Sequence, residues 1–177
     1  MIDTRNVTDE FKGAPHDEIV RELDSRGVEF EIAIENTLRD FNMGTIVRSA
    51  NAFGVRTVHI VGRKQWNRRG AMMTEKYLEI RHHDSPEYFA KMMRDAGRTI
   101  VAIDNVPGAS LLQAAQIGQR AVLVFGQEGP GISPDFLACC DQIVAIEQLG
   151  STRSLNVGVA AGIAMYEMMR RNYLPRR

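Results

Sequence analysis

Three short segments place hydrogen-bonding side chains, two of them together with glycines, inside otherwise apolar stretches. They are 42–48 (NMGTIVR), 125–131 (FGQEGPG) and 151–156 (STRSLN). Such residues supply donors, acceptors and backbone amides that a ligand can approach closely. The three segments lie far apart in the sequence, so we expect them to form one binding site only if the fold brings them together.

Patterns of strand and helix alternate around these segments. Apolar runs typical of strands cover 28–34, 57–61, 77–81, 99–103, 121–125 and 142–146. Helical spacing or helix-start residues mark 16–26, 44–53, a helix beginning near 85, 110–115, a helix beginning near 133, and 155–171. Alternating strands and helices predict an α/β fold, with a mainly parallel sheet and helices on both faces.

Three loops of this predicted sheet would share one edge. Segments 104–108, 126–131 and 147–153 all follow strands, and ligands of open parallel sheets bind outside the carboxyl ends of strands. A pocket with walls of backbone amides and carbonyls suits a nucleoside-like ligand. The organisation is therefore a polar tail and N-terminal helix over 1–27, followed by a single domain over 28–177.

Composition narrows the class of protein. Of the 177 residues, 44% are apolar and 25% are charged, as is usual for a globular domain. No apolar run reaches ~18 residues, and the N-terminus lacks a signal-peptide layout, so we expect a cytoplasmic protein without a membrane partner. The two cysteines are adjacent and lack zinc-type partners, so no metal site is expected.

Charge is unevenly distributed although the net charge is zero. Residues 1–40 carry 11 acidic and 5 basic side chains, and residues 41–177 carry 11 acidic and 17 basic ones. A basic body is compatible with a nucleic-acid partner, although it does not establish one.

The glycine-containing segment 125–131 fits neither common nucleotide-binding motif. It lacks the G-x-G-x-x-G pattern and the lysine of a P-loop, and it lies late in the chain. A dinucleotide-dependent oxidoreductase using Asp104 on a ribose remains one alternative. A simple tight turn is another.

The three segments together resemble the SpoU family of RNA ribose 2′-O-methyltransferases in the SPOUT superfamily. The matching positions are Asn42, Gly44, Arg48, Ala50, Phe53 and Gly54, then Phe125, Gly126, Glu128 and Gly131, then Ser154, Leu155, Asn156, Val157, Ala160 and Ala161. The resemblance covers roughly residues 28–172. It implies a deep C-terminal trefoil knot, S-adenosylmethionine as cofactor, and a homodimer with active sites near the interface.

The same resemblance implies roles for individual residues. Ile103, Gly126, Ile146 and Leu155 would contact the cofactor, and Asn42, Arg48, Glu128, Ser154 and Asn156 would surround the reacting ribose. Arginine is hard to deprotonate, so we favour Arg48 as an electrostatic stabiliser of the developing oxyanion, with action as a base as the alternative. One departure is visible after Ile146, where the family usually has proline and an apolar residue and this chain has Glu147 and Gln148.

Each catalytic candidate also has a structural interpretation. Arg48 could be a surface residue and Glu128 a solvated loop acid. Asn42 could cap one helix and Ser154 the last one, with Asn156 as a first-turn polar residue.

A basic loop provides the strongest sign of an RNA partner. Residues 62–70 carry the only tryptophan and four basic side chains without an acid: Arg63, Lys64, Trp66, Arg68 and Arg69. Positive charges beside an aromatic ring suit single-stranded RNA, whereas Trp66 packing on a helix or on a dimer partner is the alternative. The C-terminal 170–177 is a second basic cluster.

Two further patterns have no role in the predicted site. His82 and His83 are interpreted as a surface pair. The methionines, including Met72 and Met73, are assigned mainly to helical core or interface positions.

The predicted function is S-adenosylmethionine-dependent methyl transfer to a ribose 2′-hydroxyl of tRNA. Ribosomal RNA is the alternative substrate, and a non-catalytic RNA-binding module that retains the fold is the alternative function.

Overall fold

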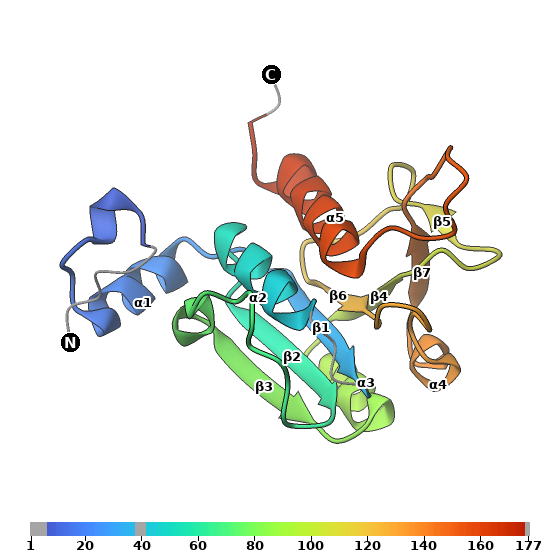
Figure 1. The fold of residues 1–177 in the computed structure, drawn as a ribbon, viewed down its shortest axis with the longest axis horizontal. Coiled ribbons are helices and arrows are strands. Elements are labelled where there is room, and N and C mark those ends of the chain that lie inside the picture. Colours follow the sequence, from blue (N-terminus) through green and yellow to red (C-terminus); the bar gives the residue numbers. More distant parts are fainter. Residues whose placement is uncertain (1–6, 38–41, 176–177) are drawn as a thin grey trace.

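The computed structural model describes residues 7–37 and 42–175, which form a central sheet with helices on both faces (Figure 1). Seven parallel strands pair in the order β3-β2-β1-β6-β4-β7-β5. The strands are β1 (Glu31–Asn36), β2 (Thr57–Gly62), β3 (Glu79–His83), β4 (Thr99–Ile103), β5 (Ser110–Leu111), β6 (Ala121–Phe125) and β7 (Gln142–Ala145). The helices are η1 (Asp9–Phe11), α1 (His16–Ser25), α2 (Met43–Ala52), η2 (Thr74–Tyr77), α3 (Pro86–Asp95), α4 (Pro134–Ala138) and α5 (Val157–Asn172).

Residues of β1 alternate between two apolar cores, one on each side of the sheet. Ile32 and Ile34 belong to the core under α2 and α5, whereas Ala33 belongs to the core under α3 and α4. All three side chains are almost wholly buried, as a strand covered on both faces requires. The predicted α/β class and parallel sheet are confirmed, and the knot implied by the resemblance stays a prediction.

Two helices begin where the sequence predicts, because serine caps them. Ser85 accepts a hydrogen bond from the backbone N–H of Tyr88 at 3.3 Å, and Ser133 accepts one from Phe136 at 3.2 Å. Each serine precedes a proline at the first helical position, where the missing N–H costs nothing.

The helix expected over 110–115 is wrong. Ser110 and Leu111 instead form the edge strand β5, which pairs with Val144 and Ala145 of β7. The backbone N–H of Leu112 then donates to the carbonyl of Ala145 at 2.8 Å, before the chain turns. Pairing with an open sheet edge satisfies these backbone groups, which a single helical turn would leave partly unbonded.

The expected surface pair of histidines is also wrong, because His83 is buried. Its Nε2 lies 2.8 Å from Nδ1 of the fully buried His59, whose Nε2 lies 2.9 Å from Glu31 Oε2. Arg98 completes this chain of polar groups with an ion pair to Glu31 Oε1 at 2.6 Å. The ring of Phe89 on α3 contacts both imidazoles edge-on.

Met72 and Met73 are not helical. Both have left-handed backbone conformations, with φ of 53° and 64°, and both side chains are exposed. Met165 and Met168 of α5, in contrast, are buried in the core as expected.

Candidate active site

The glycine-containing loop after β6 closes on itself immediately. Gln127 and Gly131 exchange two backbone hydrogen bonds, each 3.1 Å long. A side chain at Gly126 would overlap with the backbone of Gly131 and Ile132, so only glycine permits this approach. The closed loop fixes the position of Glu128 beside the end of the sheet.

Asp104, which follows β4, holds this loop against its neighbour. Its Oδ2 accepts a hydrogen bond from the backbone N–H of Ile132 at 2.9 Å, and its Oδ1 accepts one from Asn105 at 2.8 Å. The sequence suggests Asp104 only as a ribose ligand of an oxidoreductase, and this positioning role was missed. An acidic residue directly after a strand was the available signal.

Three side chains from distant segments meet in a hydrogen-bonded cluster, which we call the amide–carboxylate triangle. It consists of Asn42, Glu128 and Asn156. Asn42 Nδ2 donates to Glu128 Oε2 at 2.6 Å, and Asn156 Nδ2 donates to Asn42 Oδ1 at 2.9 Å and to Glu128 Oε1 at 3.3 Å. The fold therefore joins the three sequence segments at one point.

Asn156, rather than Ser154, is the cap of the last helix. Its Oδ1 accepts from the backbone N–H groups of Gly158 at 3.0 Å and Val159 at 3.3 Å. Asn42 stands at the N-cap position of α2 but makes no side-chain capping bond. Its side-chain amide bonds Glu128 and Asn156 instead, so the suggestion that the Asn42 side chain caps α2 is wrong.

Arg48 does not join the triangle. It lies six residues beyond Asn42 on α2, which places it about 9 Å further along the helix axis. Its side chain is exposed, and within 7–37 and 42–175 it has no hydrogen bond or ion pair. The guanidinium is thus available on the surface of α2, away from the triangle.

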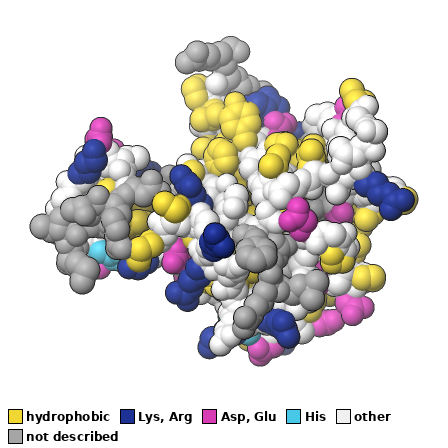
Figure 2. Space-filling view, in the orientation of Figure 1, with side chains coloured by type: hydrophobic (Ala, Val, Ile, Leu, Met, Phe, Trp, Pro, Cys, Tyr) yellow, Lys and Arg dark blue, Asp and Glu magenta, His cyan; other side chains and the backbone are white. Residues whose placement is uncertain are grey.

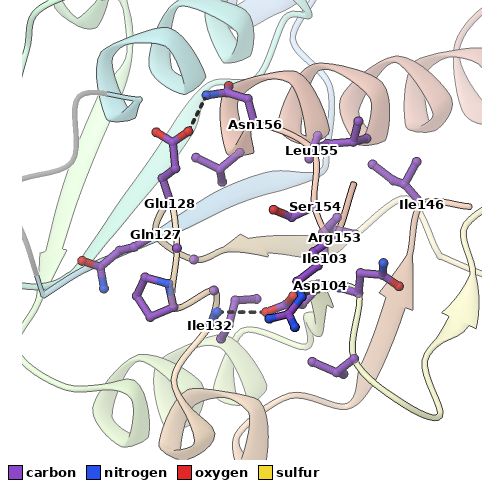
Figure 3. Close-up of a pocket in the computed structure, with 18 of the residues that line it drawn as sticks. Ile103, Asp104, Gln127, Glu128, Ile132, Ile146, Arg153, Ser154, Leu155 and Asn156 are labelled. Atoms are coloured by element: carbon purple, nitrogen blue, oxygen red, sulfur yellow. Dashed lines mark hydrogen bonds between the residues drawn. The ribbon is translucent and has the colours of Figure 1, made fainter. Parts of the chain in front are cut away.

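A cavity of about 420 Å³ opens beside the triangle, at the carboxyl ends of β4, β6 and β7 (Figure 3). All four predicted cofactor residues line it: Ile103, Gly126, Ile146 and Leu155. Glu128, Ser154 and Asn156 line it too, whereas Asn42 and Arg48 do not. In Figure 3, Ile146 and Leu155 lie toward one end of the cavity and Glu128 toward the other.

The basic loop is anchored to the same edge of the sheet. Asn36, fully buried at the end of β1, donates through Nδ2 to the carbonyls of Arg63 at 2.6 Å and Gln65 at 3.0 Å. A side chain at Gly44 of α2 would overlap with the carbonyl oxygen of Arg69. The loop therefore rests directly on the first turn of α2.

Within this loop the side chains divide into two groups. Arg63, Lys64, Arg68 and Arg69 are exposed, whereas Trp66 is half-buried against the core. The guanidinium of Arg68 lies over the Trp66 ring, 5.7 Å from its centroid.

The C-terminal basic cluster has structural partners. Arg170 and Arg171 both bond Glu167, with three hydrogen bonds of 2.7 to 2.8 Å. Bonds from Arg170 and Arg171 hold the pKa of the Glu167 carboxyl at about 2. Arg171 also donates to the carbonyl of Ala115 at 2.6 Å, so it links α5 to the segment that follows β5.

The geometry and the sequence define one class of protein. The model of the SpoU rRNA methylase family matches residues 29–166, and the chain belongs to this family.

Individual relatives are similar over most of the chain. The tRNA (guanosine(18)-2′-O)-methyltransferase of Escherichia coli K12 is 26% identical over 151 residues, which are 84% of this chain and 66% of that protein. The crystal structure of the Aquifex aeolicus TrmH/SpoU tRNA modifying enzyme has a TM-score of 0.77 at 27% identity, covering 88% of this chain and 81% of the other.

A second structure, the AdoMet-bound rRNA methyltransferase of Sinorhizobium meliloti, has a TM-score of 0.73 at 26% identity. It covers 88% of this chain and 61% of the other. The chain thus spans about two thirds of the length of the Escherichia coli relative and about three fifths of the Sinorhizobium chain.

Two absences concern the described part of the chain. In residues 7–37 and 42–175, no helix is long and apolar enough to cross a membrane. The same residues contain no group of three or more histidine, cysteine, aspartate or glutamate side chains placed to hold a metal ion.

Proposed function

We propose that this protein transfers a methyl group from S-adenosylmethionine to a ribose 2′-hydroxyl of tRNA. The observation that carries the proposal is the amide–carboxylate triangle at the mouth of the cavity. Three polar side chains from separate segments converge there, although stability would not require them to meet at a solvent-facing edge. Family membership and the printed activity of the Escherichia coli relative support the choice of reaction and substrate.

The cavity fits the cofactor. Apolar side chains of Ile146 and Leu155 can contact an adenine base, and Gly126, which has no side chain, also lines the cavity. The volume of about 420 Å³ lies within the range of small-molecule sites. When bound, S-adenosylmethionine supplies a methyl group activated on a sulfonium, and no metal is needed.

The side chains of the triangle position the ribose. Each asparagine has an amide that can bind a hydroxyl, and Glu128 keeps both amides oriented by accepting their hydrogen atoms. Ser154 lies on the cavity wall between the two ends, where its hydroxyl can bond substrate. Such positioning supplies much of the rate of a displacement that requires in-line approach.

Arg48 stabilises charge as the 2′-oxygen loses its proton. A guanidinium remains charged at any ordinary pH, so it favours the developing oxyanion and the neighbouring phosphate more naturally than it accepts a proton. Its exposed position suits contact with an RNA backbone.

RNA also contacts the basic loop. Four exposed cations stand on a backbone that is fixed to β1 and α2, next to the triangle. We assign the phosphate contacts to Arg63, Lys64, Arg68 and Arg69, with Trp66 as their packed support. A tRNA substrate places this reaction in the cytoplasm.

The second copy of this chain covers an apolar row on α5. Val159, Ile163 and Tyr166 are spaced along one face and are 52%, 39% and 52% exposed. The centroid of the Tyr166 ring lies 6.4 Å from that of Phe53, which directly follows α2, and hydrophobic side chains gather around α5 in Figure 2. A homodimer through this face brings Arg48 of one copy toward the cavity of the other.

The test measures methyl transfer from labelled S-adenosylmethionine to tRNA and to ribosomal RNA, followed by mapping of the modified ribose. Arg48→Ala should abolish transfer while changing cofactor affinity by no more than a few-fold. Full activity in this variant would overturn the role of Arg48. Transfer to ribosomal RNA alone would overturn the tRNA assignment.

Mixing two inactive variants tests the shared site. In a symmetric dimer with Arg48 acting on the partner's cavity, equal amounts of Arg48→Ala and Asn156→Ala chains should recover about a quarter of the activity. Sites built within one chain would recover none. Ile163→Glu should prevent both dimerisation, measured by light scattering, and recovery.

A further inference from the structure

The loop after β6, which carries Glu128, is bonded by a carboxylate from each of the two strands beside β6. In the sheet, β6 lies between β1 and β4. Asp104, which follows β4, accepts from the backbone N–H of Ile132, as the dashed line in Figure 3 shows. Glu35 of β1 accepts through Oε2 from the next backbone N–H along the chain, that of Ser133, at 2.8 Å. Two carboxylates therefore bond consecutive amides where the loop returns to the fold.

The register of β1 places Glu35 beside this loop. Ile34 pairs with Phe125, the last residue of β6, so Glu35 lies next to the point where the loop begins. Thr37, two residues further along, accepts a hydrogen bond from the side-chain amide of Gln127. The end of β1 thus bonds the loop both near its start and at its return.

Glu35 is buried to a degree that packing alone does not explain. The residue is 2% exposed, and within residues 7–37 and 42–175 its carboxylate has no ion pair. A carboxylate that is removed from water without an opposite charge is costly, and an apolar side chain of similar size would fill the space more favourably. The acid at this position therefore serves its bond to the loop rather than the stability of the core.

We propose that Glu35 is a positioning residue for the transfer reaction, and that it acts through the loop on Glu128. This inference rests on the proposed function. The bond to Ser133 fixes the return of the loop, and the two backbone bonds between Gln127 and Gly131 close it. Glu128 enters the amide–carboxylate triangle from this closed turn. Loss of the bond releases the return of the loop, so Glu128 no longer orients the asparagine amides that position the ribose.

The test is a double-substitution cycle on kcat, measured with S-adenosylmethionine and tRNA both saturating. Glu35→Leu removes the acceptor and should lower kcat about tenfold, while the KM for tRNA stays within about twofold. In a protein that already carries Glu128→Ala, the same substitution should lower kcat less than about twofold, because a residue that acts through Glu128 has no further effect once that side chain is gone. Glu35→Gln keeps an acceptor oxygen, so its kcat should stay within about twofold of the wild type.

Asp141→Leu is the matched control. Asp141 Oδ2 accepts from the backbone N–H of Ile100 at 2.8 Å, which is the same kind of bond. It lies near the amino ends of β4 and β7, away from the cavity at their carboxyl ends. Its loss should reduce the free energy of unfolding, while kcat stays within about twofold. A general loss of packing would instead lower kcat in both variants.

Hydrogen exchange on the free protein tests the loop without a bound cofactor or RNA. The amide of Gly131 donates to the carbonyl of Gln127 at 3.1 Å, and Glu35→Leu should increase its exchange rate about tenfold. Asp141→Leu should leave this rate within about twofold. If the leucine variant at position 35 does not fold, Glu35→Asp takes its place in both measurements, because its shorter side chain draws the carboxylate away from Ser133.

Equal losses of kcat from Glu35→Leu with and without Glu128 overturn the inference, as does an unchanged exchange rate at Gly131. A wild-type protein that transfers no methyl group to tRNA overturns the proposed function and this inference with it. Transfer by the wild type, with independent effects of the two substitutions, overturns the inference alone.

Discussion

Two clusters of polar side chains in this protein differ in environment although they are built alike. The amide–carboxylate triangle and the chain of Arg98, Glu31, His59 and His83, of which all but Arg98 are buried, each join side chains from separate segments by polar contacts of 2.6 to 3.3 Å. The triangle stands at loop ends beside solvent, and the histidine chain lies between the sheet and α3.

The hydrogen bond to Glu31 determines the proton positions in the histidine chain. The carboxylate of Glu31 accepts, so His59 donates through Nε2 and accepts at Nδ1 from Nε2 of His83. His83 Nδ1 is then an acceptor, which is buried and has no partner among the described residues. Water can rescue a broken bond in the triangle but not in this chain. The triangle should therefore matter for activity, and the histidine chain for stability.

The largest effect that tests this contrast is the loss of activity in Glu128→Ala. Removing the carboxylate frees both asparagine amides from their orientation, so transfer should fall about 100- to 1000-fold. The free energy of unfolding should change by less than about 1 kcal/mol, because the site faces water. Activity assays and denaturant unfolding measure the two quantities, and Asp95→Ala is an exposed control that should alter neither.

Substitution of His59 should give the reverse result. His59→Leu fills the volume but leaves Glu31 and His83 without their shared partner, and should reduce the free energy of unfolding by about 3 kcal/mol. The rate of transfer at saturating substrate should stay within about twofold. A stable protein with low activity would contradict the separation of roles. His82→Ala, on the neighbouring strand β3, provides the comparison.

The pH dependence of stability tests the histidine chain without a substitution, because it changes only the protonation of His83. Burial lowers the pKa of His83 to about 4, with the charges of His59 and His82 acting in the same direction. The unfolded chain binds a proton at this side chain between pH 6.5 and 4 and the folded chain does not, so stability is full above pH 6.5 and falls as the pH decreases through that window. The loss should reach about 3 kcal/mol.

Unfolding curves at pH 7 and pH 4.5 measure this loss. Other carboxylates also titrate in this range, so the decisive quantity is the difference between the wild-type protein and His83→Gln. The variant should show a smaller decrease, and an equal decrease would exclude His83 as its source.

The smallest expected effect on stability belongs to Asn156, which takes part in both capping and the triangle. Asn156→Asp keeps an acceptor for the N–H groups of Gly158 and Val159, so stability should change by less than about 0.5 kcal/mol. The new carboxylate faces Glu128 and cannot donate to it, so activity should be lost. A thermal melt with an activity assay checks both, and a melting temperature many degrees lower would contradict this interpretation.

Local patterns predicted much of the fold. The strands over 99–103 and 121–125 are apolar on both faces, and their bounds agree with the structure. The helical spacing at 110–115 gave a wrong prediction. The segment forms strand β5 because it pairs with the open edge of β7, more than thirty residues further along the chain. Short segments follow such tertiary pairing rather than their own propensity.

The site was predictable in its residues but not in its geometry. Family resemblance indicated Asn42, Glu128 and Asn156, yet no pattern in one segment reveals that the three side chains touch. The positioning residues Asp104 and Asn36 were missed because their partners are backbone groups of other loops. His83 was misassigned because its partner, His59, lies on the neighbouring strand β2.

The approach of the basic loop to Gly44 has a mechanical consequence. Two backbones touch there without an intervening side chain, so no change of rotamer can alter their separation. The backbone of the basic loop at Arg69 therefore keeps a fixed separation from the first turn of α2, which Asn42 precedes. An RNA bound by the loop would therefore be positioned relative to α2 by backbone packing rather than by side chains that can change rotamer.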